Sequence, residues 1–375
     1  MQQDDRLPRR DIWLLPLISL ATLIIMLAGA ELVTRVTWPE QAVNACRIPD
    51  PMVGYRYRPN CSSTTKAAEG SWSTNDYNEC GYRSPAACGA APAGSRRIAL
   101  IGTSLSEGYM IEYSKTIAAR LSVDLTAMCG LPVEVQNLGA HGATDRALLL
   151  WMDEALRLRP DAVVLVLAPF DLETELGEAS APLAGQAVVD SGGLLHRLSL
   201  QLRNSRALLV AQHFLFLNPS IYLPLYLRYG DKADFLRPPF SSNWAERLRL
   251  FEAMITEMAE RTHKAGVALM FGFVPHQAQL AFLMGQPTPA GIDPTAFSKA
   301  LGAIAARHGV AFADTSVALR TEPAPEQLYH QVDTHLSGEG QAMAGDYLAQ
   351  RLAADSGKAF SACNHIISSS SGATP

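Results

Sequence analysis

Five short apolar runs, separated by helical patterns, are the feature that most limits the folds open to this chain. They occupy residues 97–102, 133–139, 162–169, 267–274 and 310–314, and turn or polar residues close each of them. Continuous apolar runs of this length are typical of parallel strands that are buried on both faces. Helical patterns lie between and after them, at residues 116–128, 145–158, 244–263, 294–308 and 338–352. This alternation predicts an α/β fold with a doubly wound, mostly parallel five-stranded sheet and right-handed crossovers.

The uncharged segment at residues 12–30 predicts a transmembrane helix. At about 1.5 Å per residue, such a helix nearly crosses the hydrocarbon core of a bilayer. Three arginines precede the segment, whereas Glu31 and Arg35 follow it, so the positive-inside rule places the N-terminus in the cytoplasm and exports the rest. A cleaved signal peptide is the alternative, because residues 28–30 fit a cleavage site. The apolar run is long for a signal peptide, which favours a retained anchor.

The composition divides the chain into five parts. We expect a cytoplasmic N-terminus at 1–11, a transmembrane helix or signal anchor at 12–33, a loop-rich stalk with cysteines at 34–95, the α/β domain at 96–355 and a disordered tail at 356–375. A long helical insertion at 173–243 interrupts the domain between its third and fourth strands. Its apolar and aromatic stretches could cover the site, face a membrane or form ordinary core helices, and periodicity does not separate these alternatives.

Charge and cysteine content narrow the range of partners. The net charge is -5 and no basic block occurs, which argues against nucleic acid. Four of the six cysteines lie in the predicted stalk: Cys46, Cys61, Cys80 and Cys88. At least two of these are expected to form a disulfide after export. Cys129 and Cys363 could pair or stay free, and the cysteine spacing is not that of a zinc site, so no metal is expected.

Four residues at the ends of the predicted strands are candidates for chemistry, because ligands of an open α/β sheet sit outside the carboxyl ends of its strands. Ser104 follows the first run at a strand-to-helix turn, which would expose its hydroxyl. Gly142 follows the second run, where a glycine lets the backbone approach a ligand, although a plain tight turn explains it equally well. Asp333 and His335 follow the fifth run. Residues two apart on an extended segment point the same way, so Asp333 can hold one ring nitrogen of His335 while the other faces Ser104.

Other residues at strand ends are possible pocket residues: His141, Phe170 and Asp171, with His276 and Asp314. A structural role competes for each of the polar ones, since polar residues at strand ends commonly cap helices.

Together, the order of these elements resembles the SGNH/GDSL hydrolase superfamily, over roughly residues 97–352. The resemblance implies a flavodoxin-like SGNH fold and acyl transfer, with Ser104 as nucleophile, His335 as general base and Asp333 fixing the tautomer of His335. The backbone N–H groups of Ser104 and Gly142 would form the oxyanion hole. Neither a metal nor an organic cofactor is implied.

Two departures from the family pattern matter. Thr103 stands where the family usually has an aspartate, and Phe170 stands where it has an asparagine that helps to stabilise the oxyanion. Loss of one such donor typically costs about 10²- to 10³-fold in rate.

Residues 54–60 and 78–83 resemble the stalk of membrane-anchored bacterial members of the superfamily. The expected location is therefore the bacterial inner membrane, with a single span and the catalytic domain in the periplasm or outside the cell.

We expect a serine esterase or O-acyl transferase, with acetyl as the expected group, acting on an ester-bearing envelope glycan or lipid. A lipase or thioesterase is one alternative. The departure at Phe170 suggests another, a weak pseudo-hydrolase that binds envelope glycan or serves as a scaffold.

Overall fold

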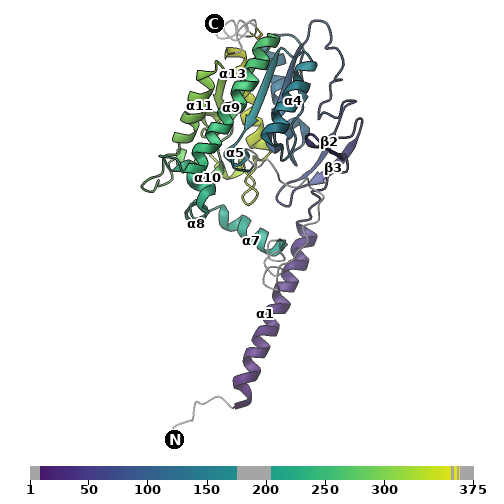
Figure 1. Ribbon diagram of the computed structural model, residues 1–375. Helices are drawn as coiled ribbons and strands as arrows, with labels where there is room; N and C mark the ends of the chain where they lie inside the picture. Colours follow the sequence, from purple (N-terminus) through teal and green to yellow (C-terminus); the bar gives the residue numbers. More distant parts are fainter. Residues whose placement is uncertain (1–8, 175–203, 356–358, 361–362, 364–375) are drawn as a thin grey trace, which may run out of the picture.

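The computed structural model describes residues 9–174, 204–355, 359–360 and 363 (Figure 1). Its centre is a five-stranded parallel sheet in the order β6-β5-β7-β8-β9. The strands are β5 (Arg96–Gly102), β6 (Val133–Asn137), β7 (Ala162–Leu167), β8 (Ala268–Phe273) and β9 (Ala311–Asp314). Every residue of β7 is buried, as expected for a strand covered on both faces. The predicted fold class is confirmed.

Two layers of helices cover the sheet, each over its own buried apolar cluster. One face packs under α4 (Asp145–Arg157), α9 (Ser242–Ala265) and α11 (Ala296–Arg307). The other packs under α3 (Ile117–Cys129) and α13 (Gly338–Asp355). Fully burying each large apolar side chain contributes about 1.5–3 kcal/mol, so these two interfaces dominate the stability of the domain.

Threonine side chains start the two helices that flank β6. The hydroxyl of Thr116 accepts a hydrogen bond from the N–H of Ala119 in the first turn of α3, and Thr144 does the same for Ala147 in α4. Each cap satisfies an amide that would otherwise lack a partner, which is worth about 1 kcal/mol.

Among the described residues, α1 (Arg9–Thr37) is the one helix that is long and apolar enough to cross a membrane by itself. Its apolar window is entirely exposed in the structure, and it extends away from the α/β body (Figure 1). A signal sequence can also be long and apolar enough, so a membrane span and a signal sequence both stay open.

The segment predicted as a loop-rich stalk forms two antiparallel hairpins. β1 (Arg47–Asp50) pairs with β2 (Gly54–Tyr57), and β3 (Ser62–Lys66) pairs with β4 (Trp72–Asp76). The loop after the hairpins contacts the α/β body, since the backbone N–H of Arg83 donates to Asn137 O at 3.1 Å. The first hairpin also contacts it, since the hydroxyl of Tyr57 in β2 donates to Glu107. This segment is thus part of the folded body rather than a free tether.

All six cysteines form disulfides: Cys46–Cys61, Cys80–Cys88 and Cys129–Cys363. The predicted disulfides in the N-terminal segment are confirmed, and the open alternative for Cys129 and Cys363 is settled in favour of a pair. Three disulfides indicate an oxidising compartment.

The described part of the insertion is helical. α5 (Pro169–Thr174) follows β7, and α7 (Arg206–Phe216), α8 (Pro219–Tyr226) and the 3-10 helix η2 (Gly230–Leu236) lead into α9. Part of the predicted insertion at 173–243 and most of the predicted tail at 356–375 lie outside the described residues.

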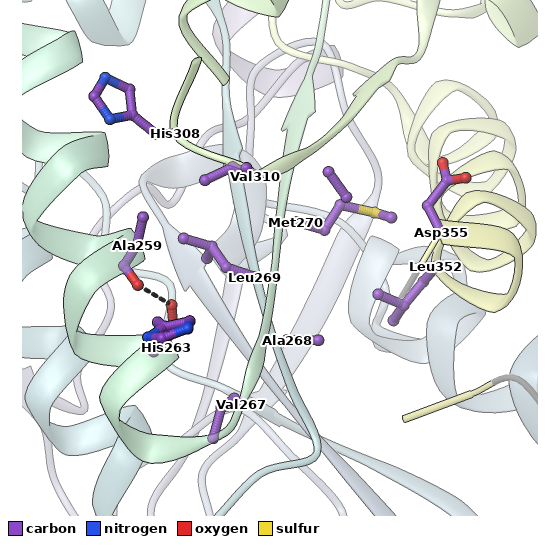
Figure 2. A pocket seen from close by; sticks show the side chains of 13 residues that line it. Ala259, His263, Val267, Ala268, Leu269, Met270, His308, Val310, Leu352 and Asp355 are labelled. Carbon is purple, nitrogen blue, oxygen red and sulfur yellow. Dashed lines mark hydrogen bonds between the residues drawn. The ribbon is translucent and has the colours of Figure 1, made fainter. Parts of the chain in front are cut away.

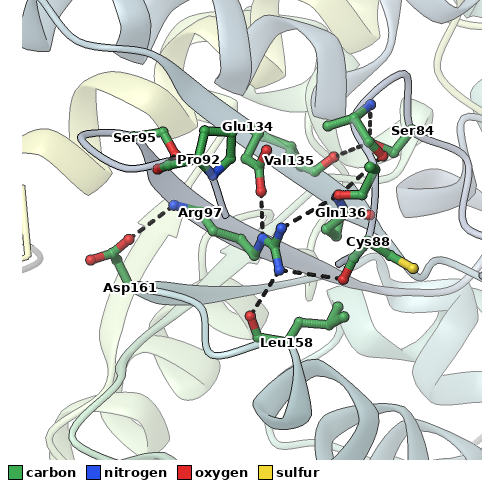
Figure 3. A network of polar contacts seen from close by, with 12 residues as sticks. Ser84, Cys88, Pro92, Ser95, Arg97, Glu134, Val135, Gln136, Leu158 and Asp161 are labelled. Carbon is green, nitrogen blue, oxygen red and sulfur yellow. Dashed lines mark hydrogen bonds and ion pairs between the residues drawn. The ribbon is translucent and has the colours of Figure 1, made fainter. Parts of the chain in front are cut away.

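Arg97 ties the amino-terminal edge of the sheet together (Figure 3). It is a residue of β5 and is 2% exposed. Its Nε donates to Glu134 Oε1 at 2.5 Å, and its Nη1 donates to Leu158 O at 3.0 Å and to Cys88 O at 3.5 Å. Its backbone N–H donates to Asp161 Oδ2 at 2.9 Å. One buried guanidinium therefore joins β5 to β6, to the turn before β7 and to the Cys80–Cys88 loop.

Replacing Arg97 with Met should lower the free energy of unfolding by about 3–5 kcal/mol, because Glu134 and the carbonyls would lose their partner inside the protein. The neighbouring Arg96 is 43% exposed on its side chain and pairs with Asp161 at 2.6 Å, so Arg96→Met should cost about 1 kcal/mol or less. Urea unfolding of the detergent-solubilised chain measures both. Equal losses for the two variants would contradict this account of the network.

Candidate active site

Ser104 begins α2 (Ser104–Glu107) directly after the turn that ends β5. The turn needs Gly102, whose φ is 147°. A Cβ on Gly102 would lie 2.2 Å from Ser106 Oγ and 2.4 Å from the carbonyl oxygen of Val166, so no side chain fits there. This close approach sets the serine at the carboxyl edge of the sheet.

Ser104, His335 and Asp333 form a continuous hydrogen-bonded series. Ser104 Oγ lies 2.7 Å from His335 Nε2, and His335 Nδ1 lies 2.8 Å from Asp333 Oδ2. The histidine side chain is 14% exposed, and that of Asp333 is 45% exposed. The structure thus brings together the three side chains that the sequence singled out, in the order that a nucleophile, a base and an orienting carboxylate require.

The loop that carries Asp333 and His335 is a tight turn rather than the extended segment expected from the sequence. Thr334 between them has φ 65°, in the left-handed region. Its N–H donates to His330 O at 2.8 Å, and the N–H of His330 donates to His335 O at 2.9 Å. A β-branched residue in this region is strained, and such strain is held in place by the surrounding structure.

Asp333 and His335 each stabilise the charged form of the other. Burial lowers the pKa of His335, but the charge and hydrogen bond of Asp333 outweigh burial, and the net pKa lies above the ordinary value of 6.5. Burial raises the pKa of Asp333, but the charge and hydrogen bond of His335 outweigh it, and the net pKa lies below 3.8. Asp333 is therefore ionised at neutral pH, and His335 becomes a neutral base only above its raised pKa.

The turn after β6 carries the other residues expected near an oxyanion. Gly139 approaches α2 so closely that a Cβ would lie 2.3 Å from the N–H nitrogen of Glu107. Gly142 has φ 69° and is exposed. Among the described residues, neither the N–H of Ser104 nor that of Gly142 donates to a protein acceptor, whereas the N–H of Gly139 donates to Asn137 Oδ1. These two amides are therefore candidate donors to an acceptor that enters the site.

His141 lies close to His335 and makes a ring contact with it. Its ring centroid is 6.5 Å from that of His335 and 4.7 Å from that of Tyr109. Burial, the largest cause, lowers its pKa, so His141 is neutral at pH 7.

Phe170 and Asp171 lie in the first turn of α5, which follows the carboxyl end of β7. The ring of Phe170 lies 5.2 Å from that of His335 and lines the neighbouring pocket. Asp171 accepts hydrogen bonds from the hydroxyl of Thr103 and, at 2.7 Å, from the N–H of Ala168. Thr103 and Asp171 therefore join the ends of β5 and β7, which gives the first departure from the family pattern a structural role.

The pocket beside His335 is rich in aromatic side chains. It has a volume of ≈ 530 Å³ and its lining includes Phe170, Thr334, Phe216, Tyr222, Tyr226 and Tyr229. His276, also in the lining, is buried and caps α10 (Gln277–Leu283) by accepting from the N–H of Ala278. Asp314 lies elsewhere, where it accepts from the hydroxyl of Ser298 and the N–H of Ser316, so its role is structural.

A second cavity, of ≈ 370 Å³, opens at the opposite edge of the sheet (Figure 2). It is lined by the first residues of β8 and β9, with His263 of α9 on one side and Asp355 of α13 on the other. Because the carboxyl ends of the strands lie away from it, this cavity is remote from Ser104.

Sequence reasoning missed the buried carboxylates that hold the site. Glu107 accepts from the N–H of His141 at 3.0 Å and from the hydroxyl of Tyr57. Glu69 accepts from the N–H groups of Val332 and Asp333, at 3.0 and 2.9 Å. Glu69 and Tyr57 belong to the segment predicted as a stalk, and no local sequence pattern connects them to loops that lie far away in the chain.

The sequence model of the GDSL-like lipase/acylhydrolase family matches residues 100–343. The chain belongs to this family. The match runs from β5 to α13 and includes Ser104, Asp333 and His335. Membership in the GDSL-like family confirms the predicted superfamily and the predicted enzyme class, a serine hydrolase of the esterase or acylhydrolase type. The catalytic roles of the individual residues stay a prediction.

Solved structures give more distant likenesses. A lipolytic protein of the G-D-S-L family from Desulfitobacterium hafniense is 14% identical with a TM-score of 0.39, over 68% of this chain and 99% of that one. An acetyl xylan esterase from Geobacillus stearothermophilus is also 14% identical with a TM-score of 0.39, over 68% and 94%. No curated protein matches the chain. The family assignment therefore rests on the match of residues 100–343 to the sequence model of the family.

The pKa of His335 gives a pH test. Since only neutral His335 can accept the proton of Ser104, kcat/KM should rise with pH, and the midpoint should lie above 6.5 because the pKa is raised. Asp333→Asn removes the cause of the increase, so its midpoint should move down while the rate falls by roughly 10⁴-fold through the wrong tautomer. Initial rates on an uncharged ester between pH 5 and 9 measure both. A midpoint that stays in place in Asp333→Asn would show that Asp333 does not set the pKa of His335.

Proposed function

We propose that this chain is a serine esterase or O-acyl transferase that works through an acyl-enzyme on Ser104. The observation that carries the proposal is the series of two hydrogen bonds, 2.7 Å from Ser104 to His335 and 2.8 Å from His335 to Asp333. A serine hydroxyl is a weak nucleophile unless a base accepts its proton, and the geometry provides that base.

In the first half of the reaction, Ser104 Oγ attacks the ester carbonyl while its proton passes to His335 Nε2. Asp333 stabilises the imidazolium that forms, and it holds the ring by its Nδ1–H. The N–H groups of Ser104 and Gly142 are the proposed donors to the oxyanion. His335 then gives its proton to the departing alkoxide, which leaves as an alcohol and leaves the acyl group on Ser104.

In the second half, water or an acceptor hydroxyl loses a proton to His335 and attacks the carbonyl of the acyl-enzyme. The bond between the acyl group and Ser104 Oγ then breaks, and His335 returns the proton to Ser104. Water gives hydrolysis, whereas a hydroxyl gives transfer, and the residues are the same for both. Phe170 beside His335 offers an apolar wall instead of a hydrogen-bond donor. Such a wall restricts water near the acyl group and in this way favours transfer.

The proposed substrate is an O-acylated glycan or lipid of the cell envelope, with acetyl as the expected acyl group. Two features support it. The disulfides and α1 fit an exported, membrane-attached protein, which meets such substrates. The pocket beside His335 presents Tyr222, Tyr226 and Tyr229, whose rings offer apolar faces with a polar tip. The same aromatic lining favours a lipase or thioesterase as the second candidate, with an acyl chain in the pocket.

The test is a kinetic comparison of Ser104→Ala, His335→Ala and the double variant on p-nitrophenyl acetate. Each single variant should lose nearly all activity, and the double variant should be little worse, because residues that act in one step are not additive. Release of acetate from envelope polysaccharide then separates the first candidate from the lipase or thioesterase.

Independent, additive losses would assign separate roles to Ser104 and His335. If the wild-type protein itself does not exceed Ser104→Ala, then the serine is not a working nucleophile, and a glycan-binding or scaffold role takes the lead.

A further inference from the structure

Helices α7 and α8 lie on the side of the body from which α1 leaves (Figure 1). Large apolar side chains in these helices and directly after them are exposed. We call this group the apolar face; it consists of Leu208, Phe214, Leu215, Leu217, Ile221, Leu225 and Tyr229. Phe214 is the most exposed, at 61%. Single exposed apolar residues are ordinary, but here five lie in α7 and α8 and two directly follow these helices. Leu215, Leu225 and Tyr229 line one groove, so the group includes a patch that indicates a binding surface.

The start of α7 is fixed to the end of α1. The carboxylate of Glu31 in α1 accepts hydrogen bonds from the N–H groups of Arg206 and Ala207, at 3.1 and 3.0 Å, and from the hydroxyl of Ser205 at 2.8 Å. A negative charge at a helix N-terminus is stabilising, since the first amides of the helix have no partner within it. The position of α1 therefore determines the position of α7.

Aromatic contacts continue this junction. The ring of Trp38, just after α1, lies 5.0 Å from that of His213 and 6.3 Å from that of Phe214, both in α7. Tryptophan is enriched at the boundary between lipid and water. With α1 as a retained span, its uncharged stretch ends before Glu31, which puts the junction at the membrane surface.

The geometry of α7 and α8 argues for a surface position rather than a second span. Together the two helices are apolar enough to resemble a span, but they are bent by 110° at the break between them. Each is too short to cross alone, at 11 and 8 residues. Short apolar helices held beside a membrane anchor fit the boundary between headgroups and acyl chains.

We propose that the apolar face of α7 and α8 docks on the surface of the same lipid bilayer that holds α1. The anchor supplies the attachment, and the apolar face fixes the orientation of the body. Arg228, exposed beside Tyr229, adds a positive charge where lipid phosphates would lie.

This docking places the candidate active site close to the lipid. Phe216 and Tyr229 line both the pocket beside His335 and a shallow groove between α7 and α8 that includes Leu215 and Leu225. In addition, His213 of α7 lies 2.7 Å from Glu69, which holds the N–H of Asp333. The docking surface and the site therefore share residues, although docking does not require that the enzyme be active.

Single cysteines with an environment-sensitive fluorophore test the proposal in the full chain, since its six native cysteines are all paired. The labelled variants are Phe214→Cys on α7 and Leu225→Cys on α8. Val123→Cys on α3 is the control, because Val123 is also an exposed apolar residue, at 55%, and its helix packs on α13 rather than on α1. All three are placed in vesicles of phosphatidylethanolamine with a minor share of phosphatidylglycerol, and circular dichroism checks that each is folded.

The labels at 214 and 225 should emit at shorter wavelength than the label at 123. They should also lose most of their fluorescence to lipids that carry a nitroxide near the glycerol backbone, while the label at 123 loses little. Emission at 214 and 225 like that at 123 would overturn the proposal. So would a shorter wavelength without nitroxide quenching, which indicates a second copy of the chain on this face. Stronger quenching by nitroxides at the end of the acyl chain would also overturn it, in favour of a buried span.

Discussion

The contact between Ser104 and His335 joins residues 231 positions apart, and it depends on the parallel sheet. In a parallel sheet all strands end at the same edge, so the turn after β5 and the loop after β9 meet there. Gly102 lets the first of these turns lie against β7 without a side chain between them. A change that shifts β5 against β7 would therefore separate Ser104 from His335. For this reason the buried network of Arg97 at the far edge supports the contact between Ser104 and His335, although it touches neither residue.

The N-terminal hairpins supply a second set of supports. Glu69 holds the backbone of Asp333, and Glu107 together with Tyr55 holds His141, whose carbonyl accepts from the Tyr55 hydroxyl at 2.7 Å. Arg83 is buried and donates to the carbonyls of Glu107 and Gly108, which fixes the end of α2 behind Ser104. Loops that carry reacting groups must be held to a fraction of an ångström, and here much of that restraint comes from outside the α/β domain.

The sequence was sufficient to predict the sheet, its helices and the three residues that the structure places in series. Buried parallel strands leave a clear apolar signal, and the residues after them are few. The supports were not predictable, because Glu69 contacts residues 332 and 333 through folding alone and lies in a segment with weak periodicity. The turn at Thr334 was also missed, since a threonine gives no sign of a positive φ. What Phe170 does for the reaction stays a prediction.

Covalent labelling with a fluorophosphonate tests the central claim most directly, because such a probe reacts with a serine only when a neighbouring base removes its proton. The detergent-solubilised wild-type chain should take up one probe, and peptide mass spectrometry should locate it on Ser104. Labelling should be absent in Ser104→Ala and nearly absent in His335→Ala. A wild-type protein that stays unlabelled, or that is labelled at another serine, would contradict the assignment of Ser104 as an activated nucleophile.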